Sequence, residues 1–283
     1  MPVGGGTYTE RDVEEFFDQT LDSYLTFWDD DGVLHTGYFA DGNTSDYQAA
    51  AQQTSAVLSE AAMIDSSSRV LDVGSGCGNF LMYLASTSGC GGEGLDLSEE
   101  RVRFALQRLS GEQASRITFR HGSATQLPYD PETFTHVVSQ DALFLVPDKP
   151  RSHAEIMRVL KPGGILAFSD FLQPRAQISE RARTHVFDRV RWNDGYSLIG
   201  YQRALDRCGF EILLARNLRA HIRQTYHVLG EAATTRLEEV SDPAGRNWLR
   251  AFAQSCREIQ IAIDDEEFGW GLFVARKRPG AEH

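Results

Sequence analysis

The chain has 283 residues, of which 41% are hydrophobic and 24% are charged, proportions that are ordinary for a globular protein with a full core. Its 28 Lys and Arg against 40 Asp and Glu give a net charge of −12, which disfavours nucleic-acid and anionic-membrane partners because those need clustered basic residues. No apolar run approaches the roughly 20 residues of a membrane span. The absence of a secretion-signal pattern and of metal or redox spacing among the four cysteines favours a reduced, cytoplasmic location.

Residues 1–65 are predicted to form an N-terminal helical cap or lid. Apolar side chains recur every three or four residues between Val13 and Tyr24, a stripe typical of an amphipathic helix. A turn-rich stretch with two Asp-Gly pairs follows, and a second helix is expected at residues 47–62. The first helix can fold over its own active site or dock on a second copy of the chain, so a homo-oligomer formed through it is an open alternative.

The rest of the chain, residues 66–283, alternates short apolar runs with helix-length segments. Strands are expected at residues 69–73, 92–97, 117–121, 134–139, 164–170, 211–216 and 269–276, and helices between them at residues 80–86, 99–110 and 151–160. This alternation predicts an α/β fold with a doubly wound, mostly parallel seven-stranded sheet of the Rossmann-like type. A helical stretch of about 25 residues after Asp170 and an amphipathic segment over residues 220–258 predict a late helical insertion at about residues 172–260.

The most informative stretch is RVLDVGSGCGNF, residues 69–80, where an apolar strand runs into Gly74, Gly76 and Gly78 before a helix. Glycines at such a turn let the backbone approach a ligand, and the helix N-terminus presents free N–H groups. In open α/β sheets this first turn lines the ligand crevice. The dinucleotide fingerprint requires glycine at the position of Asn79, so a nicotinamide cofactor is disfavoured.

Two acidic residues flank this turn. Asp72 lies just inside the first strand, where a carboxylate suits a cationic ligand group better than a pyrophosphate. Asp96 ends the second strand, and an acid at that spacing can accept hydrogen bonds from ribose hydroxyls. The alternative for Asp96 is a helix N-cap, but Ser98 can take that role.

Four motifs in order, DVGSGCG, GLDLS, LPYDPETFTHVVSQDAL and RVLKPGGILAFSD, resemble the class I S-adenosylmethionine-dependent methyltransferases over residues 30–275. The resemblance implies S-adenosylmethionine as the cofactor, with Asp72 and the three glycines at its methionine half. It further implies that Asp96 holds the ribose and that Leu97 lies beside the adenine. The remaining implied contacts are the adenine edge with Ser123 and Ala124, and the methionine amino group with Gln140.

The chain departs from this family at the adenine turn. Many relatives carry Asp-Ala there, and the aspartate accepts a hydrogen bond from the adenine amino group, whereas this chain has Ser123-Ala124. A hydroxyl is a weaker acceptor than a carboxylate, so we expect cofactor affinity to depend more on backbone contacts.

Within the family, HTGYF (35–39), SQDALFLVPDK (139–149) and GYSLIGYQRALDRCGF (195–210) resemble small-molecule enzymes: sarcosine/dimethylglycine N-methyltransferases and natural-product C- and O-methyltransferases. The apolar wall Leu143–Val146 suits an apolar substrate better than a small zwitterion. We therefore expect C- or O-methylation of a small, largely apolar metabolite in natural-product biosynthesis, for example an isoprenoid or an indole alkaloid such as a teleocidin-type precursor. The alternatives are N-methylation of a small amine such as sarcosine or dimethylglycine, and a non-catalytic cofactor-binding protein.

Catalytic residues are hard to identify by type, because the sulfonium activates the methyl group and the protein must mainly align the nucleophile and exclude water. Four side chains are candidates for positioning or for a general base, namely Tyr8, Tyr24, His153 and Tyr196. His35, Tyr201, Tyr226 and His227 are further aromatic or titratable side chains that can serve. Arg181, Arg183, Arg189 and Arg191 can bind a substrate carboxylate, but a solvated helix face is the favoured interpretation. No HxH or HExxH motif indicates a metal.

Overall fold

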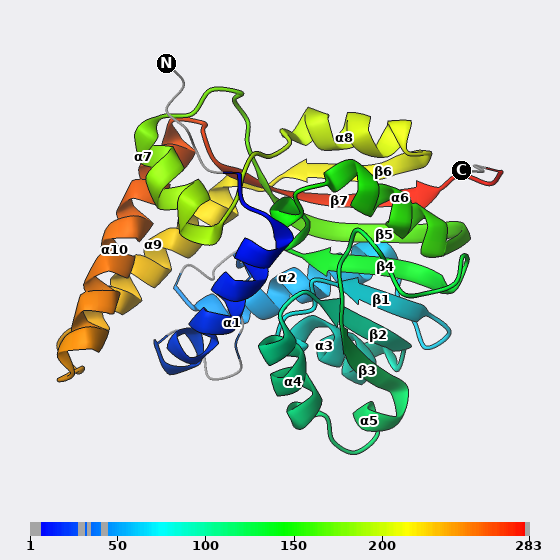
Figure 1. Cartoon of the computed structure of the whole chain (residues 1–283), viewed down its shortest axis with the longest axis horizontal. Coiled ribbons are helices and arrows are strands. Elements are labelled where there is room, and N and C mark those ends of the chain that lie inside the picture. The colour runs from blue at the N-terminus through cyan, green and yellow to red at the C-terminus, as the bar shows by residue number, and fades with distance from the viewer. Residues whose placement is uncertain (1–6, 28–31, 33–34, 41–44, 281–283) are drawn as a thin grey trace.

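Seven strands form one sheet in the order β3-β2-β1-β4-β5-β7-β6 (Figure 1). The computed structural model describes residues 7–27, 32, 35–40 and 45–280. The strands are β1 Arg69–Val73, β2 Gly91–Asp96, β3 Ile117–His121, β4 Phe134–Gln140, β5 Leu160–Leu172, β6 Phe210–Asn217 and β7 Gly269–Lys277. Neighbouring strands are parallel, except that β7 runs antiparallel to β5 and β6. The predicted Rossmann-like sheet is confirmed.

Helices cover both faces of this sheet. They are α1 Glu10–Phe27, α2 Tyr47–Ala62, α3 Asn79–Ser88, α4 Glu99–Arg108, α5 Gln113–Arg116, α6 Lys149–Val159, α7 Glu180–Ala182, α8 Leu198–Arg207, α9 Arg219–Arg236 and α10 Pro243–Asp264. Side chains cap α2, α4, α6, α8 and α10 by accepting the backbone N–H three residues on; the caps are Asp46, Ser98, Asp148, Ser197 and Asp242. Buried residues of α2, α3 and α4 pack on one face, and those of α6 and α8 on the other.

Figure 1 shows α1 lying between the sheet and the antiparallel pair α9–α10. Its Tyr24 ring meets the Trp248 ring of α10 edge-on, with centroids 6.4 Å apart. The helix therefore bridges the sheet and the late helical pair, as a cover over the edge where the parallel strands end.

The segment after β5 differs from the predicted 25-residue helix. β5 runs on to Leu172, and only short turns follow: α7, η2 Arg183–Phe187 and η3 Asp188–Val190. The helical course ends at Arg191, which has a left-handed backbone (φ 60°). Trp192 then stacks on Phe187, with ring centroids 4.1 Å apart, and is fully buried. Burial of these aromatic rings in the core therefore decides the path of the segment. The range predicted as a helical insertion, residues 172–260, also contains the strand β6.

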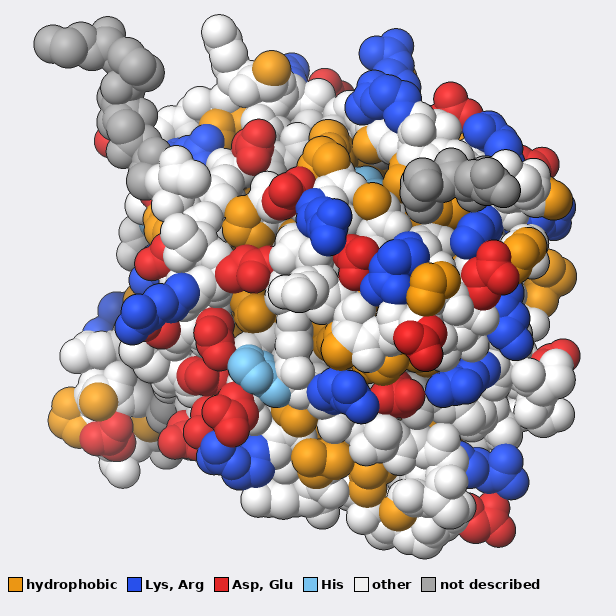
Figure 2. Space-filling view, turned by 45° about the vertical axis from the view of Figure 1, so that its right-hand side comes forward, with side chains coloured by type: hydrophobic (Ala, Val, Ile, Leu, Met, Phe, Trp, Pro, Cys, Tyr) orange, Lys and Arg blue, Asp and Glu red, His pale blue; other side chains and the backbone are white. Residues whose placement is uncertain are grey.

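The surface charges and the hydropathy of the helices were compared with what a nucleic-acid or membrane partner would need. On the face drawn in Figure 2, Lys and Arg side chains are interspersed with Asp and Glu and do not gather in one patch. Within the part of the chain that the structure describes, no helix has the length and apolarity needed to cross a membrane.

The topology positions a site at one edge of the sheet. β1 lies between β2 and β4, so consecutive connections leave β1 in opposite directions and open a crevice at the carboxyl ends of these strands. The turn after β1, the ends of β2 and β3, and the end of β4 therefore meet at this edge.

Candidate functional site

A cavity of about 1120 Å³, counted to its open mouth, lies at this edge of the sheet. The turn after β1 forms its floor, the ends of β2 and β3 one wall, the segment after β4 the other, and α1 the roof. Eight of the nine residues predicted to bind the cofactor line it: Asp72, Gly74, Gly76, Asp96, Leu97, Ser123, Ala124 and Gln140.

The three glycines of the turn all have positive φ, but for different reasons. A Cβ on Gly74 would lie 2.3 Å from Ala142 Cβ, and one on Gly78 would lie 2.6 Å from Phe119 Cζ. A Cβ on Gly76 would meet nothing within 4 Å, because it would stand in the cavity. Gly78 is outside the described lining and precedes α3, so its role here is to fit the helix against β3 rather than to contact a ligand.

Asp72 presents an unsatisfied carboxylate oxygen at this floor. The residue is 1% exposed, and its Oδ2 has no hydrogen-bond partner in the described structure, nor has the neighbouring Ser75 Oγ. Burial, reinforced by the nearby Asp96, raises the pKa of Asp72 to about 8. A cationic ligand group would supply the missing partner and favour the ionised carboxylate, which fits the ammonium group of a methionine moiety.

Two backbone N–H groups orient the carboxylate of Asp96 at the cavity, and it does not cap α4. Its Oδ2 accepts a hydrogen bond from the Gly76 N–H at 2.7 Å, and its Oδ1 accepts one from the Ser98 N–H at 2.8 Å. Ser98 itself caps α4, so the N-cap alternative for Asp96 is excluded. Burial raises the pKa of Asp96. An ionised carboxylate has about four acceptor positions, so two remain for ribose hydroxyls.

The end of β4 carries two polar residues with different roles. Gln140 donates a hydrogen bond from Nε2 to Ser55 Oγ (3.1 Å), so a helix α2 side chain orients it. Asp141, which the sequence reasoning did not single out, lines the cavity and accepts the Thr36 N–H at 2.7 Å. Asp141 also accepts hydrogen bonds from Ser169 Oγ and Trp270 Nε1, both at 2.7 Å. It thereby fastens the loop after His35 to three strands.

The predicted apolar wall follows directly, as the 3₁₀ turn η1 Leu143–Leu145. Leu143, Leu145 and Val146 line the cavity. Phe144 does not; it packs in the aromatic core, 4.5 Å from the Phe171 ring. The apolar α1 side chains Val13 and Phe17 also line the cavity, and Phe17 lies against the Arg101 guanidinium of α4, which is 4.9 Å from its ring centroid.

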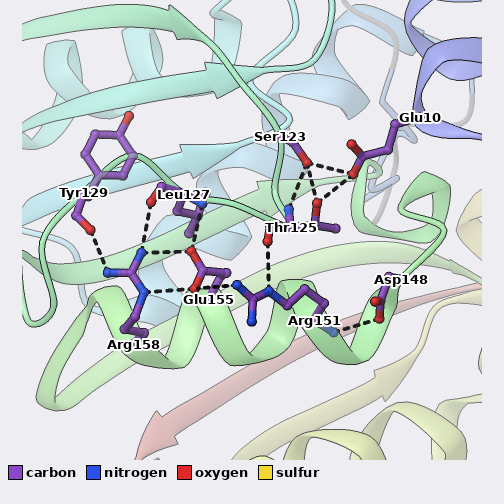
Figure 3. Close-up of polar contacts among 9 residues, drawn as sticks. All are labelled: Glu10, Ser123, Thr125, Leu127, Tyr129, Asp148, Arg151, Glu155 and Arg158. Atoms are coloured by element: carbon purple, nitrogen blue, oxygen red, sulfur yellow. Dashed lines mark hydrogen bonds and ion pairs between the residues drawn. The ribbon is translucent and has the colours of Figure 1, made fainter.

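A second set of residues that the sequence reasoning missed lies on α1. Glu10 Oε1 accepts hydrogen bonds from Ser123 Oγ (2.7 Å) and Thr125 Oγ1 (2.9 Å), as Figure 3 shows. Further along the helix, Glu14 Oε1 lies 3.1 Å from His121 Nε2, and Asp18 Oδ1 accepts a hydrogen bond from Ser98 Oγ at 2.5 Å. The available signal was the four-residue spacing of these three acids, which places them on one face of a helix.

The four predicted catalytic side chains are not among the described residues that line the cavity. Tyr8 donates a hydrogen bond from its hydroxyl to Asp188, and Tyr24 packs on Trp248 of α10. His153 and Tyr196 lie on the sheet face covered by α6 and α8, with their rings 6.2 Å apart. Burial, together with the Lys149 cation, lowers the pKa of His153 to about 4. These positions do not support contact with a reacting group.

The other side chains considered from the sequence also have structural partners. Tyr201 donates a short hydrogen bond to Asp170 behind β5, and Arg189 donates one to Tyr226. The remaining arginines are engaged elsewhere: Arg181 with Glu258, Arg183 with the Asn193 carbonyl, and Arg191 with the Asp188 carbonyl. His35 does line the cavity. Within the described residues, no group of three or more His, Cys, Asp or Glu side chains is arranged to hold a metal.

Comparison with known proteins supplies the family. A model of the methyltransferase domain matches residues 64–203. The chain is 25% identical to methyltransferase GfsG of Streptomyces halstedii over 94% of each chain, and 26% identical to 27-O-demethylrifamycin SV methyltransferase of Amycolatopsis mediterranei over 95% of this chain and 98% of that one. It is 27% identical to a glycine/sarcosine/dimethylglycine N-methyltransferase of Actinopolyspora halophila, over 95% of this chain but only 46% of that one.

The chain belongs to the class I S-adenosylmethionine-dependent methyltransferases that act on small molecules. The fold agrees: a putative sarcosine dimethylglycine methyltransferase from Galdieria sulphuraria superimposes with a TM-score of 0.82 at 23% identity, covering 92% of this chain and 99% of that one. The cofactor of this methyltransferase is S-adenosylmethionine, which supplies an electrophilic methyl group. The unsatisfied Asp72 oxygen, the open space at Gly76 and the oriented Asp96 carboxylate fit this cofactor.

Proposed function

We propose that this methyltransferase transfers the methyl group to a carbon or oxygen atom of a small, largely apolar metabolite of natural-product biosynthesis. The observation that carries the proposal is the apolar surface of Leu143, Leu145 and Val146, which line the cavity after β4. Burying a charged or zwitterionic substrate against these side chains without polar partners would be costly. An apolar substrate would instead gain free energy from the area that it removes from water.

The cofactor would lie along the carboxyl ends of β1, β2 and β3. Asp72 and Gln140 would hold its amino-acid end, Asp96 would accept hydrogen bonds from the ribose hydroxyls, and Leu97 and Ala124 would pack on the base. The sulfonium methyl would then face the wall formed by η1. Loss of the methyl group leaves S-adenosylhomocysteine, and α1 would exclude water from the transfer.

A proton must leave when the nucleophile is a hydroxyl group. His35 lines the cavity, unlike the four side chains predicted from the sequence, and is therefore the proposed base for that case. An alkene carbon would need a base only after the new carbon–carbon bond has formed.

N-methylation of a small amine that carries a carboxylate is the second candidate. The observation in its favour is Arg101, a cavity-lining residue that is 4% exposed and whose Nε and Nη2 have no hydrogen-bond partner in the described structure. A carboxylate could pair with that guanidinium in a bidentate manner. Arg101 also lies over the Phe17 ring, at 4.9 Å from its centroid, and its charge partly offsets the burial that raises the pKa of Asp96, so it already balances one buried acid.

Transfer of a labelled methyl group distinguishes the two. The enzyme would be incubated with labelled S-adenosylmethionine and a panel of isoprenoid, polyketide and indole compounds, in parallel with sarcosine and dimethylglycine. We expect label in the apolar panel. With the accepted compound, Leu145→Asn should lower kcat/KM about tenfold through lost apolar contact, while the volume-conserving Leu145→Met should retain it. If only sarcosine were labelled, and Arg101→Gln lowered that labelling, the proposal would be refuted in favour of N-methylation of a small amine.

A further inference from the structure

The polar residues at the β3 end of the cavity form a compact cluster with an unusual donor and acceptor balance. Ser123 Oγ accepts the Thr125 N–H at 3.0 Å, lies 2.7 Å from Thr125 Oγ1, and donates to Glu10 Oε1. A serine hydroxyl has one donor and two acceptor positions. Because Ser123 and Thr125 both donate their only hydroxyl proton to Glu10, their two oxygens share no hydrogen bond, and Ser123 keeps a single acceptor position, on a neutral hydroxyl, for a ligand.

Glu10 offers a stronger acceptor, a carboxylate oxygen. Both hydrogen bonds that it accepts from Ser123 and Thr125 go to Oε1, and within the described residues Oε2 has no hydrogen-bond partner. Glu10 also lines the cavity, at the first turn of α1. A carboxylate oxygen is thus available at the end of the cavity where the β3 turn, by sequence alone, offers only a hydroxyl.

The cluster is held rigidly from below by α6 (Figure 3). Arg151 Nε donates to the Thr125 carbonyl at 3.1 Å, and Glu155 Oε2 accepts the Leu127 N–H at 2.8 Å. Arg158 pairs with Glu155 and donates to the Leu127 carbonyl at 2.9 Å. The two hydroxyls that orient Glu10 therefore lie on a segment that α6, and not α1, holds in place.

The order of groups along the cavity identifies what Glu10 faces. The ribose of the cofactor belongs at Asp96, at the end of β2, and the reacting end belongs at the apolar wall after β4. The adenine then extends the other way, to the end of β3, where Gly122, Ser123 and Ala124 line the cavity beside Leu97. The exocyclic amino group of adenine is a hydrogen-bond donor in need of an acceptor at this end.

We propose that Glu10 is that acceptor, so that the first turn of α1 reads the adenine amino group and the bound cofactor latches α1 over the loaded site. The inference rests on S-adenosylmethionine as the cofactor and is independent of the substrate class proposed above. The same helix carries Val13 and Phe17 in the cavity lining, so that the residue that recognises the cofactor and the apolar side chains that exclude water belong to one element.

The test compares S-adenosylhomocysteine with S-inosylhomocysteine, in which a carbonyl oxygen replaces the amino group, by calorimetric titration. We expect the wild type to prefer the adenosyl ligand roughly 10- to 100-fold, the range of a charge-assisted hydrogen bond replaced by oxygen–oxygen repulsion. Glu10→Gln should bring the two affinities within threefold of each other, because an amide can donate to the carbonyl oxygen. Glu15→Gln, on the solvent-facing side of the same helix and paired with Arg11 at the surface, should keep the wild-type preference.

Hydrogen exchange supplies the second measurement. Exchange of the α1 amides should slow with S-adenosylhomocysteine in the wild type and in Glu15→Gln, and remain fast with S-inosylhomocysteine or in Glu10→Gln. A Glu10→Gln preference within twofold of wild type would overturn the proposal, as would a wild type that does not discriminate. If the wild type bound neither ligand, S-adenosylmethionine would be refuted as the cofactor. If it bound S-adenosylhomocysteine but methylated no apolar compound, only the proposed substrate class would be refuted.

Discussion

Replacement of Gly76 by alanine separates ligand binding from folding at the glycine turn. Gly76 has φ 52°, and a Cβ built on it meets no atom within 4 Å because it points into the cavity. The left-handed conformation costs an alanine about 1–2 kcal/mol, partly offset by about 0.4–1 kcal/mol from the less flexible unfolded chain. The net loss of roughly 1 kcal/mol corresponds to a fall in Tm of about 2–4 °C. The fold should therefore survive.

The methyl group would, however, occupy the space that the cofactor needs. Overpacking by one methyl costs about 1–3 kcal/mol, so the affinity for S-adenosylhomocysteine in a calorimetric titration should fall roughly 10- to 100-fold. Gly163→Ala is the matched control, since Gly163 has φ 75° and equally open surroundings in β5, away from the cavity. It should lose the same small amount of stability and no affinity. Affinities of the two variants within threefold of each other would refute the assignment of Gly76 to the cofactor.

Two further predictions concern buried acids. Burial raises the pKa of Asp72 to about 8, so the folded protein holds a proton there that the unfolded chain releases near pH 4, and stability falls as pH rises from about 4 to about 8. Asp72→Asn should reduce this dependence of stability on pH, measured by thermal unfolding between about pH 4 and pH 8. An unchanged dependence would contradict the conclusion that the Asp72 carboxyl group is buried and unpaired. Tyr201→Phe keeps the ring but removes the hydrogen bond to the buried Asp170, and should cost about 1–3 kcal/mol in denaturant unfolding; a loss below about 0.5 kcal/mol would show that the bond contributes little.

The sheet and much of the site could be predicted from the sequence, because the signals are local. A buried parallel strand appears as an apolar run, and a glycine turn that follows it has few other uses, so β1, Gly76 and Asp96 were all found. The helical path after β5 was predicted wrongly, because the burial of Trp192 against Phe187 depends on a core that the sequence pattern does not reveal.

The predicted catalytic residues did not reach the cavity for a similar reason. A tyrosine or histidine has the right chemistry on either face of a sheet, and only the packing of α6 and α8 shows that His153 and Tyr196 lie behind it. Glu10 was missed for the opposite reason: its partners Ser123 and Thr125 are more than 110 residues away, and a carboxylate at a helix start is ordinarily explained by the helix dipole.

The carboxylate of Asp141 has a consequence for how this scaffold diversifies. It joins Thr36, Ser169 and Trp270 through hydrogen bonds, in a left-handed backbone conformation (φ 50°) that aspartate tolerates. The apolar wall begins two residues later, at Leu143, so its starting point is fixed by the hydrogen bonds of Asp141. Exchanges at Leu145 and Val146, which are only partly buried, therefore change the shape of the wall while its anchor and the cofactor floor stay in place. Such a separation of anchoring from selectivity is a physical route by which one cofactor-binding framework acquires new substrates with few substitutions.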